Sequence, residues 1–159
     1  MVKRNLNNGS ATTTAQQLGS VIKSARDTMR KDKGLNGDID RLPMLTWIMF
    51  LKFLDDMELN REQEAELRGE PFQPLIDPPY RWRDWAANPQ VLTGDALTKF
   101  INYDETDHPF GEHNENGDVR RVPGLFAYLR GLEGSPRADV VQSIFRGVVN
   151  RMHSGYLLR

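Results

Sequence analysis

The chain has 159 residues, no cysteine and a formal net charge of −1. This length is enough for one domain with a hydrophobic core. The absence of cysteine excludes disulfides, thiol nucleophiles and cysteine metal sites, and the small net charge argues against binding nucleic acid through global charge alone. Residues 1–17 contain no apolar signal core, so we expect a cytoplasmic protein rather than a secreted one.

The N-terminal part predicts a tail and an amphipathic helix. Residues 1–13 are polar and rich in Asn, Ser and Thr, which is typical of a mobile tail. We therefore expect the folded domain to span residues 14–159. Its first helix begins at one of Thr12 to Thr14 and runs to about Arg30. The apolar face of this helix comprises Leu18, Val21, Ile22, Ala25 and Met29.

Basic residues gather on the other face of this helix and just after it. They are Lys23, Arg26, Arg30, Lys31 and Lys33. One interpretation is a strip that faces DNA phosphates. The other is an ordinary solvated face, because Asp27 and Asp32 are interleaved with the basic residues. A loop with two glycines, residues 33–37, then leads to the next helix.

The stretch Met44–Leu54, MLTWIMFLKFL, is the centre of the predicted fold. Only two of its residues are not apolar, so it predicts a helix that is buried on nearly every side and covered by the rest of the chain. Asp38 and Asp40 are N-cap candidates, and Pro43 suits a first turn. A membrane span is excluded because the apolar run is short and Lys52 interrupts it.

The segment Gly69–Gln90 predicts a long irregular connection. It contains five prolines, together with the sequence YRWRDW. The rings of Trp82 and Trp85 are expected to dock on the core while Arg81 and Arg83 stay exposed. Arginine beside tryptophan also suits contact with bases or phosphates, so both interpretations stay open.

The remaining elements predict a mainly α fold. We expect a short helix in Val91–Tyr103, a polar loop or hairpin in Asp104–Arg121 and a short helix in Val122–Leu132. Ser135 followed by proline begins a last amphipathic helix, which extends toward Met152 and covers the central one. The predicted architecture is an irregular helical bundle around a buried central helix, with a long Pro/Trp-containing connection. The apolar residues Tyr156, Leu157 and Leu158 at the end suggest that the protein continues.

Two segments have residues suited to chemistry. Asp77–Tyr80, DPPY, is similar to the motif with which amino-methyltransferases hold a flipped base. However, the strand and glycine-rich turn that should precede it are missing. His108 and His113 lie among Asp104, Glu105, Asp107 and Glu112, which are suitable metal ligands in a segment without helical spacing. We therefore predict no catalytic, cofactor or metal site in this chain.

The order of the pieces resembles a known family. The helix Leu18–Arg30, the stretch Leu42–Met57, a charged segment and YRWRDW follow one another as in the N-terminal helical domain of the DNA-methylation (M) subunit of type I restriction–modification systems. Phe50–Asp56, FLKFLDD, is similar to the FLKYLSD-like core of that family. The resemblance covers residues 15 to 150, approximately, and its motifs are hydrophobic patterns rather than catalytic ones.

The resemblance implies a role in a larger enzyme. Full-length members are adenine-specific DNA methyltransferases that use S-adenosyl-L-methionine and work with a specificity subunit and a restriction subunit. Their catalytic domain follows the helical domain, so the implied role of this segment is contact with DNA and partner subunits. The alternatives are a free-standing interaction module, which predicts an exposed patch around Trp82 and Trp85, and a small methyltransferase that uses DPPY.

Overall fold

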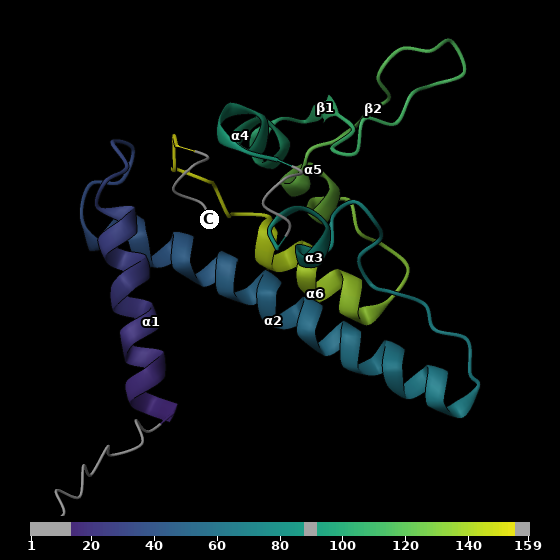
Figure 1. Ribbon diagram of the computed structural model, residues 1–159, viewed down its shortest axis with the longest axis horizontal. Coiled ribbons are helices and arrows are strands. Elements are labelled where there is room, and N and C mark those ends of the chain that lie inside the picture. Colours follow the sequence, from purple (N-terminus) through teal and green to yellow (C-terminus); the bar gives the residue numbers. More distant parts are fainter. Residues whose placement is uncertain (1–13, 88–91, 155–159) are drawn as a thin grey trace, which may run out of the picture.

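The computed structural model describes residues 14–87 and 92–154. Within them the fold is mainly α, as the sequence predicts, with one small antiparallel sheet (Figure 1). The elements are α1 (Thr14–Met29), α2 (Asp38–Arg68), α3 (Trp82–Trp85), α4 (Gly94–Asn102), β1 (Glu105–Asp107), β2 (Arg121–Pro123), α5 (Leu125–Arg130) and α6 (Pro136–Phe145). The predicted tail 1–13 and the apolar residues Tyr156–Leu158 lie outside the described residues.

Helix α2 is the spine of the molecule. It has 31 residues and is therefore about 46 Å long. Its N-cap is Gly37, at φ 90°, so Asp38 and Asp40 lie in the first turn and not at the N-cap position that the sequence predicts. There they still favour the positive end of the helix dipole. Pro43 lies one turn further inside the helix than expected.

The inner face of α2, defined here by Met44, Trp47, Leu51 and Leu54, carries the core. These four side chains are at most 7% exposed. The ring of Trp47 meets Phe126 of α5 edge-on, with centroids 5.2 Å apart. Helices α3 to α5 and the sheet lie along this side of α2 (Figure 1). The apolar inner face thus gathers segments from the whole second half of the chain.

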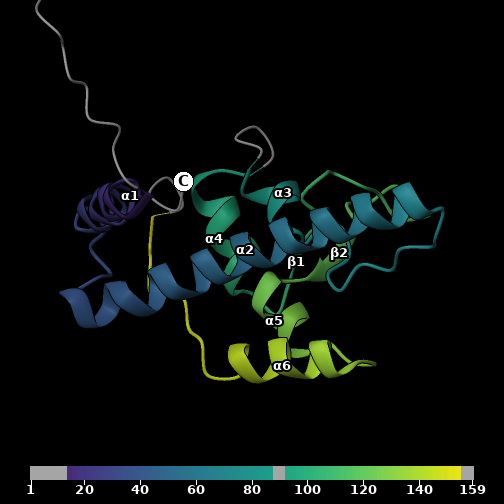
Figure 2. The ribbon, with the colours of Figure 1, turned by 90° about the horizontal axis from the view of Figure 1, so that it is seen from below.

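The outer face of α2 is not covered by the described chain. We define it by Leu42, Met49, Phe53 and Met57, which are spaced by seven, four and four residues and so share one side of the helix. Met49 is half-buried. Leu42 is 56% exposed, Phe53 57% and Met57 49%. In Figure 2, the view from below, α2 crosses in front of the other helices of the domain. The expectation that the chain buries this helix on nearly every side is therefore wrong.

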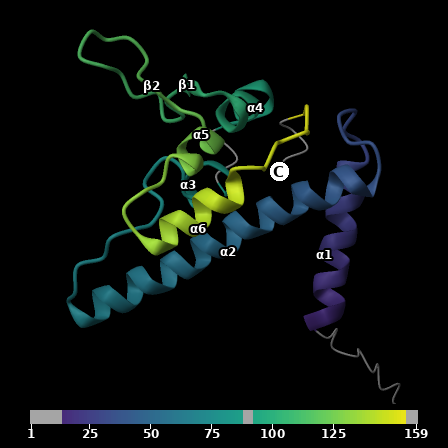
Figure 3. The same ribbon diagram turned by 180° about the vertical axis from the view of Figure 1, so that it is seen from behind.

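Helix α6 begins as predicted and ends early. The hydroxyl of Ser135 accepts a hydrogen bond from the N–H of Ala138 at 3.1 Å, which is the expected N-cap. The helix ends at Phe145. There the Arg130 guanidinium donates hydrogen bonds to the carbonyl of Phe145 at 3.1 Å and to that of Val148 at 3.0 Å, and so pairs carbonyls that a helix end leaves without a partner. Phe145 packs on Phe50 of α2, with ring centroids 5.9 Å apart. The view from behind shows α6 against α2 (Figure 3).

The segment between α4 and α5 is a hairpin. Strands β1 and β2 pair antiparallel, with Thr106 opposite Val122. The intervening residues project away from the helices (Figure 1). Of the two expectations for this segment, loop or hairpin, the hairpin is confirmed.

Candidate nucleic-acid interface

The five predicted basic residues lie on α1 and on the link from α1 to α2. Lys23, Arg26 and Arg30 are spaced by three and four residues, so they share one side of the helix. Lys31 and Lys33 follow at once in the link, and both side chains are exposed. The five residues thus lie along the second half of α1 and on the link that leads to the N-terminal end of α2.

Two of the five are held by carboxylates. Arg26 bonds to Asp38 at 2.6 Å, which ties α1 to the first turn of α2. This hydrogen bond holds the pKa of the Asp38 carboxyl below its usual value. Arg30 pairs with Asp27 at 3.1 Å. Within residues 14–87 and 92–154, no ion pair is formed by Lys23, Lys31 or Lys33, so these lysines keep their full charge toward solvent.

Asp32 has a structural role that sequence reasoning missed. It is only 4% exposed, and its carboxylate accepts the N–H groups of Gly34 at 2.8 Å, His153 at 3.1 Å and Ser154 at 2.8 Å. Asp32 therefore lies below the surface, and its carboxylate binds backbone N–H groups rather than a basic side chain of the strip. The short-range signal was Asp followed two residues later by Gly, which is typical of an Asx turn.

The close approach of the chain at this point depends on Gly34. A Cβ atom there would collide with the carbonyl oxygen of Arg151. Arg151 also pairs with Asp40 at 2.7 Å. The link between α1 and α2 and the end of the described chain are thus fastened together.

The apolar face of α1 is only partly buried. Met29 is 4% exposed, whereas Leu18 is 48% and Val21 65% exposed. The stripe that packs on the domain at the end of α1 therefore continues uncovered toward its beginning. In Figure 1, α1 extends past α2 away from the body of the domain.

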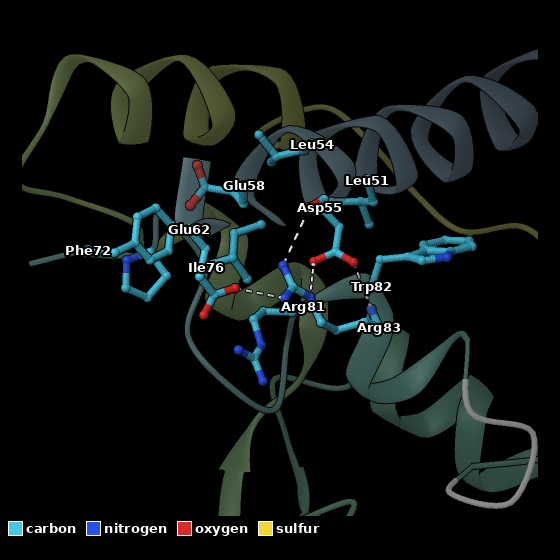
Figure 4. Close-up of a pocket in the computed structure, with 11 residues that line it drawn as sticks. Leu51, Leu54, Asp55, Glu58, Glu62, Phe72, Ile76, Arg81, Trp82 and Arg83 are labelled. Atoms are coloured by element: carbon cyan, nitrogen blue, oxygen red, sulfur yellow. Dashed lines mark hydrogen bonds and ion pairs between the residues drawn. The ribbon is translucent and has the colours of Figure 1, made fainter. Parts of the chain in front are cut away.

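The segment YRWRDW packs against the rest of the domain and does not offer its arginines to a ligand. Arg83 bonds to Asp55 at 2.9 Å and to Glu62 at 3.0 Å (Figure 4). These carboxylates raise the pKa of Arg83 despite the opposing effect of burial. Arg81 is held by Asp84 at 2.8 Å. Neither guanidinium is free for a phosphate or base, so the packing interpretation is favoured.

The tryptophans of this segment do not form the patch that an interaction module requires. Trp85 is 2% exposed, and its ring meets Trp82 edge-on with centroids 5.1 Å apart. Trp82 lines a cavity of about 130 Å³ with Leu51 and Leu54. The prediction of an exposed patch around both tryptophans is wrong for Trp85.

Beside this cavity, Glu58 joins three parts of the chain. The residue is 4% exposed on α2. It accepts the N–H of Leu75 at 2.6 Å and forms an ion pair with Arg137 of α6. A buried carboxylate is tolerated only when it is paired in this way, so Glu58 fastens both the proline-rich connection and α6 to α2.

The DPPY segment is also part of the core. The Tyr80 ring stacks on Tyr128, with centroids 3.8 Å apart, and on Phe100 at 5.9 Å. Its hydroxyl donates to the carbonyl of Pro123 at 2.9 Å, and burial raises the pKa of this hydroxyl to about 12. Tyr80 is only 5% exposed, so its ring is part of the aromatic core and is not presented to stack on a flipped base.

The two histidines of the hairpin are not brought together as metal ligands. His108 is 7% exposed and lies 3.4 Å from Glu112, whereas His113 forms an exposed bridge with Val119. Among the described residues, no group of three or more candidate ligands is placed to hold a metal. None of the helices in residues 14–87 and 92–154 has the length and apolar character to cross a membrane.

Comparison with known proteins identifies the family of this helical chain. Residues 18–127 match the family described as HsdM N-terminal domain. The chain belongs to this family. The match covers α1 to the beginning of α5, and therefore includes the α1–α2 link, the proline-rich connection and the hairpin.

Relatives of this HsdM N-terminal domain are larger. The methylase subunit of the type I restriction enzyme EcoEI of Escherichia coli is 39% identical over 142 residues, which are 89% of this chain and 25% of that subunit. A solved modification subunit, assigned to a type I restriction enzyme of Vibrio vulnificus YJ016, is 59% identical, with a TM-score of 0.81 over 94% of this chain and 30% of its own.

A second solved relative comes from a study of complex assembly and conformational transition in the type I R-M system. It is 30% identical, with a TM-score of 0.65 over 92% of this chain and 25% of its own. The chain thus spans between a quarter and a third of each of these relatives.

Proposed function

We propose that this chain is the non-catalytic N-terminal domain of a DNA methyltransferase subunit of a type I restriction–modification system. The match of residues 18–127 to the HsdM N-terminal domain family carries this proposal. The full-length protein transfers a methyl group from S-adenosyl-L-methionine to adenine in DNA. It acts in the cytoplasm with a specificity subunit, which reads the DNA sequence, and with a restriction subunit.

The full-length subunit and its specificity subunit provide the test of this activity. Incubated with labelled S-adenosyl-L-methionine and DNA that holds the target site, they should produce N6-methyladenine. The 159-residue chain in place of the full-length subunit should give none, because the Tyr80 ring of the DPPY segment is buried in the core and is not exposed to stack on a base. Methylation by the short chain alone would favour the small-methyltransferase alternative.

Within this role, we propose that the basic strip of Lys23, Arg26, Arg30, Lys31 and Lys33 contacts DNA phosphates. The three lysines support it, because they are exposed and form no ion pair within the described residues. Arg26 is the least suitable residue to mutate, because its bond to Asp38 also fixes α1. The sharper variant is therefore Lys23→Ala with Lys31→Ala and Lys33→Ala.

The measurement is the salt dependence of DNA binding by the assembled methyltransferase. The triple lysine variant should weaken binding uniformly across sequences, and the slope of log K against log salt should fall by about 0.9 for each phosphate that the variant no longer neutralises. Lys99→Ala, an exposed lysine on α4, is the matched control and should leave the slope unchanged. Equal slopes for the triple variant and the control would show that the strip is only a solvated helix face.

A further inference from the structure

The outer face of α2 has the properties of a surface that is permanently covered. Its four apolar residues extend over positions 42 to 57, which correspond to about 22 Å of helix. A charged pair at its border, Lys52 with Asp56 at 2.6 Å, adds no net charge. A long apolar stripe without net charge resembles an obligate interface more than a transient one.

Helix α1 carries a second uncovered apolar stripe. Leu18 and Val21 are exposed on the side of α1 that ends in the buried Met29. Figure 1 shows α1 running past α2 and away from the body of the domain.

We propose that the outer face of α2 docks the remaining part of the same polypeptide, the domain that carries the methyltransferase chemistry. The inference rests on the proposed function. The matched region is only 25% of the EcoEI methylase subunit and 30% of the Vibrio modification subunit, so most of such a polypeptide lies outside this domain. A covalently attached domain is always present at high effective concentration, which suits a face that is apolar throughout.

The end of the described chain lies near the N-terminal end of α2. His153 and Ser154 are held by Asp32, in the link between α1 and α2. Arg151 is fastened to Asp40 in the first turn of α2. A polypeptide that continues from this point starts beside the corner where α1 meets α2. A helix with apolar residues at three- and four-residue spacing is the element that best matches the stripe.

The test uses the full-length subunit with a photo-crosslinking benzoylphenylalanine at position 53. Illumination should join this position to residues beyond 159 of the same chain, at a yield that does not change on dilution. The same probe at Phe110 is the matched control, because Phe110 is 47% exposed and Phe53 57%, but it lies on the hairpin. We expect at least tenfold less crosslinking there.

A second measurement keeps the inference testable if the probe disturbs the fold. In the full-length subunit, Phe53→Asp should increase the rate of proteolytic release of the N-terminal domain about tenfold over Phe110→Asp, since a charge cannot be buried unpaired in an apolar contact. Equal release rates would overturn the inference.

Other crosslinking patterns have equally definite meanings. Crosslinks between two copies, crosslinks to another subunit, or equal yields at positions 53 and 110 would each overturn the proposed occupant. DNA methylation by the same preparation is measured in parallel. Normal methylation with no intrachain crosslink refutes only this inference, whereas absent methylation by the unmodified subunit with its specificity subunit refutes the proposed function.

Discussion

The inner and outer faces of α2 are nearly equal in apolar character and opposite in environment. The inner face carries Met44, Trp47, Leu51 and Leu54, which are at most 7% exposed, whereas Leu42 and Phe53 on the outer face are more than half exposed. Burial of a side chain of this size stabilises a fold by about 2 kcal/mol. The inner face therefore stabilises the domain, whereas the outer face is left with surface that the described chain does not bury.

The two faces also differ in the burial and pairing of their charged side chains. Asp55 and Glu58 are buried on the inner side, where arginines from distant segments pair with them. Lys52 and Asp56 pair near the outer face at half exposure. An ion pair on the inner side thus connects different elements, whereas the outer pair connects only two turns of one helix. This comparison gives four predictions.

The largest effect is expected from matched leucines. Leu51→Ala should lower the free energy of unfolding of the 159-residue chain by about 2–5 kcal/mol, because Leu51 is 3% exposed and its removal leaves a cavity. Leu42→Ala, on the same helix but 56% exposed, should cost about 0.5 kcal/mol or less. Urea denaturation measures both. Similar costs would mean that the outer face is also buried.

Neighbouring aspartates give the next effect. Asp55→Ala should cost about 2–3 kcal/mol, because it leaves the Arg83 guanidinium and the Arg83 N–H without the acceptor that they have at 2.9 and 3.1 Å. Asp56→Ala removes only an exposed pair with Lys52 and should cost about 0.3–0.5 kcal/mol. The same denaturation measurement applies, and a larger cost at Asp56 would reverse our assignment of the two sides.

Local features of these elements could be predicted from the sequence. Ser135 followed by proline gave the start of α6, and the length of the apolar stretch identified α2 as the centre, because caps and apolar runs act over a few residues. The cover of α2 could not be predicted in this way. When a helix is apolar on all sides, its sequence does not predict which side the rest of the chain will bury.

The buried charges were missed for the same reason. Asp55 and Glu58 stand where the apolar stretch gives way to a charged segment, and their partners Arg83 and Arg137 lie far along the chain. Asp32 similarly read as a surface charge within the basic strip, although it binds His153 and Ser154. Only the fold brings such partners together, so a sequence pattern of acids and bases does not separate a solvated face from a buried network.

A pH-dependent prediction tests the inner side. Burial raises the pKa of Tyr80 from 10.0 to about 12, so the folded chain keeps this proton where the unfolded chain loses it. Stability is therefore full below pH 10 and should fall by about 2–3 kcal/mol as the pH rises toward 12. Tyr80→Phe should remove this part of the pH dependence. Denaturation curves between pH 9 and 12 make the measurement, and an unchanged profile in the variant would place Tyr80 outside the core.

The smallest effect on stability comes with the sharpest contrast in reactivity. Met44 and Met57 lie on the same helix, but Met44 is 1% exposed and Met57 49%. The Met44 sulfur also accepts the Trp47 indole N–H at 3.5 Å. Met57 is at the surface, so its oxidation should change the free energy of unfolding by no more than about 0.5 kcal/mol. With dilute peroxide and mass spectrometry, Met57 of the 159-residue chain should oxidise more than tenfold faster than Met44.

The same pair of methionines then reports on the outer face in the full-length subunit. If the attached domain covers α2, the oxidation rate of Met57 should fall toward that of Met44, because both sulfurs are then shielded from solvent. Met44 serves as the internal reference, since its environment is set within this domain. An oxidation rate for Met57 that is equal in the short and full-length chains would mean that the outer face stays open, and that its apolar residues await a partner outside the polypeptide.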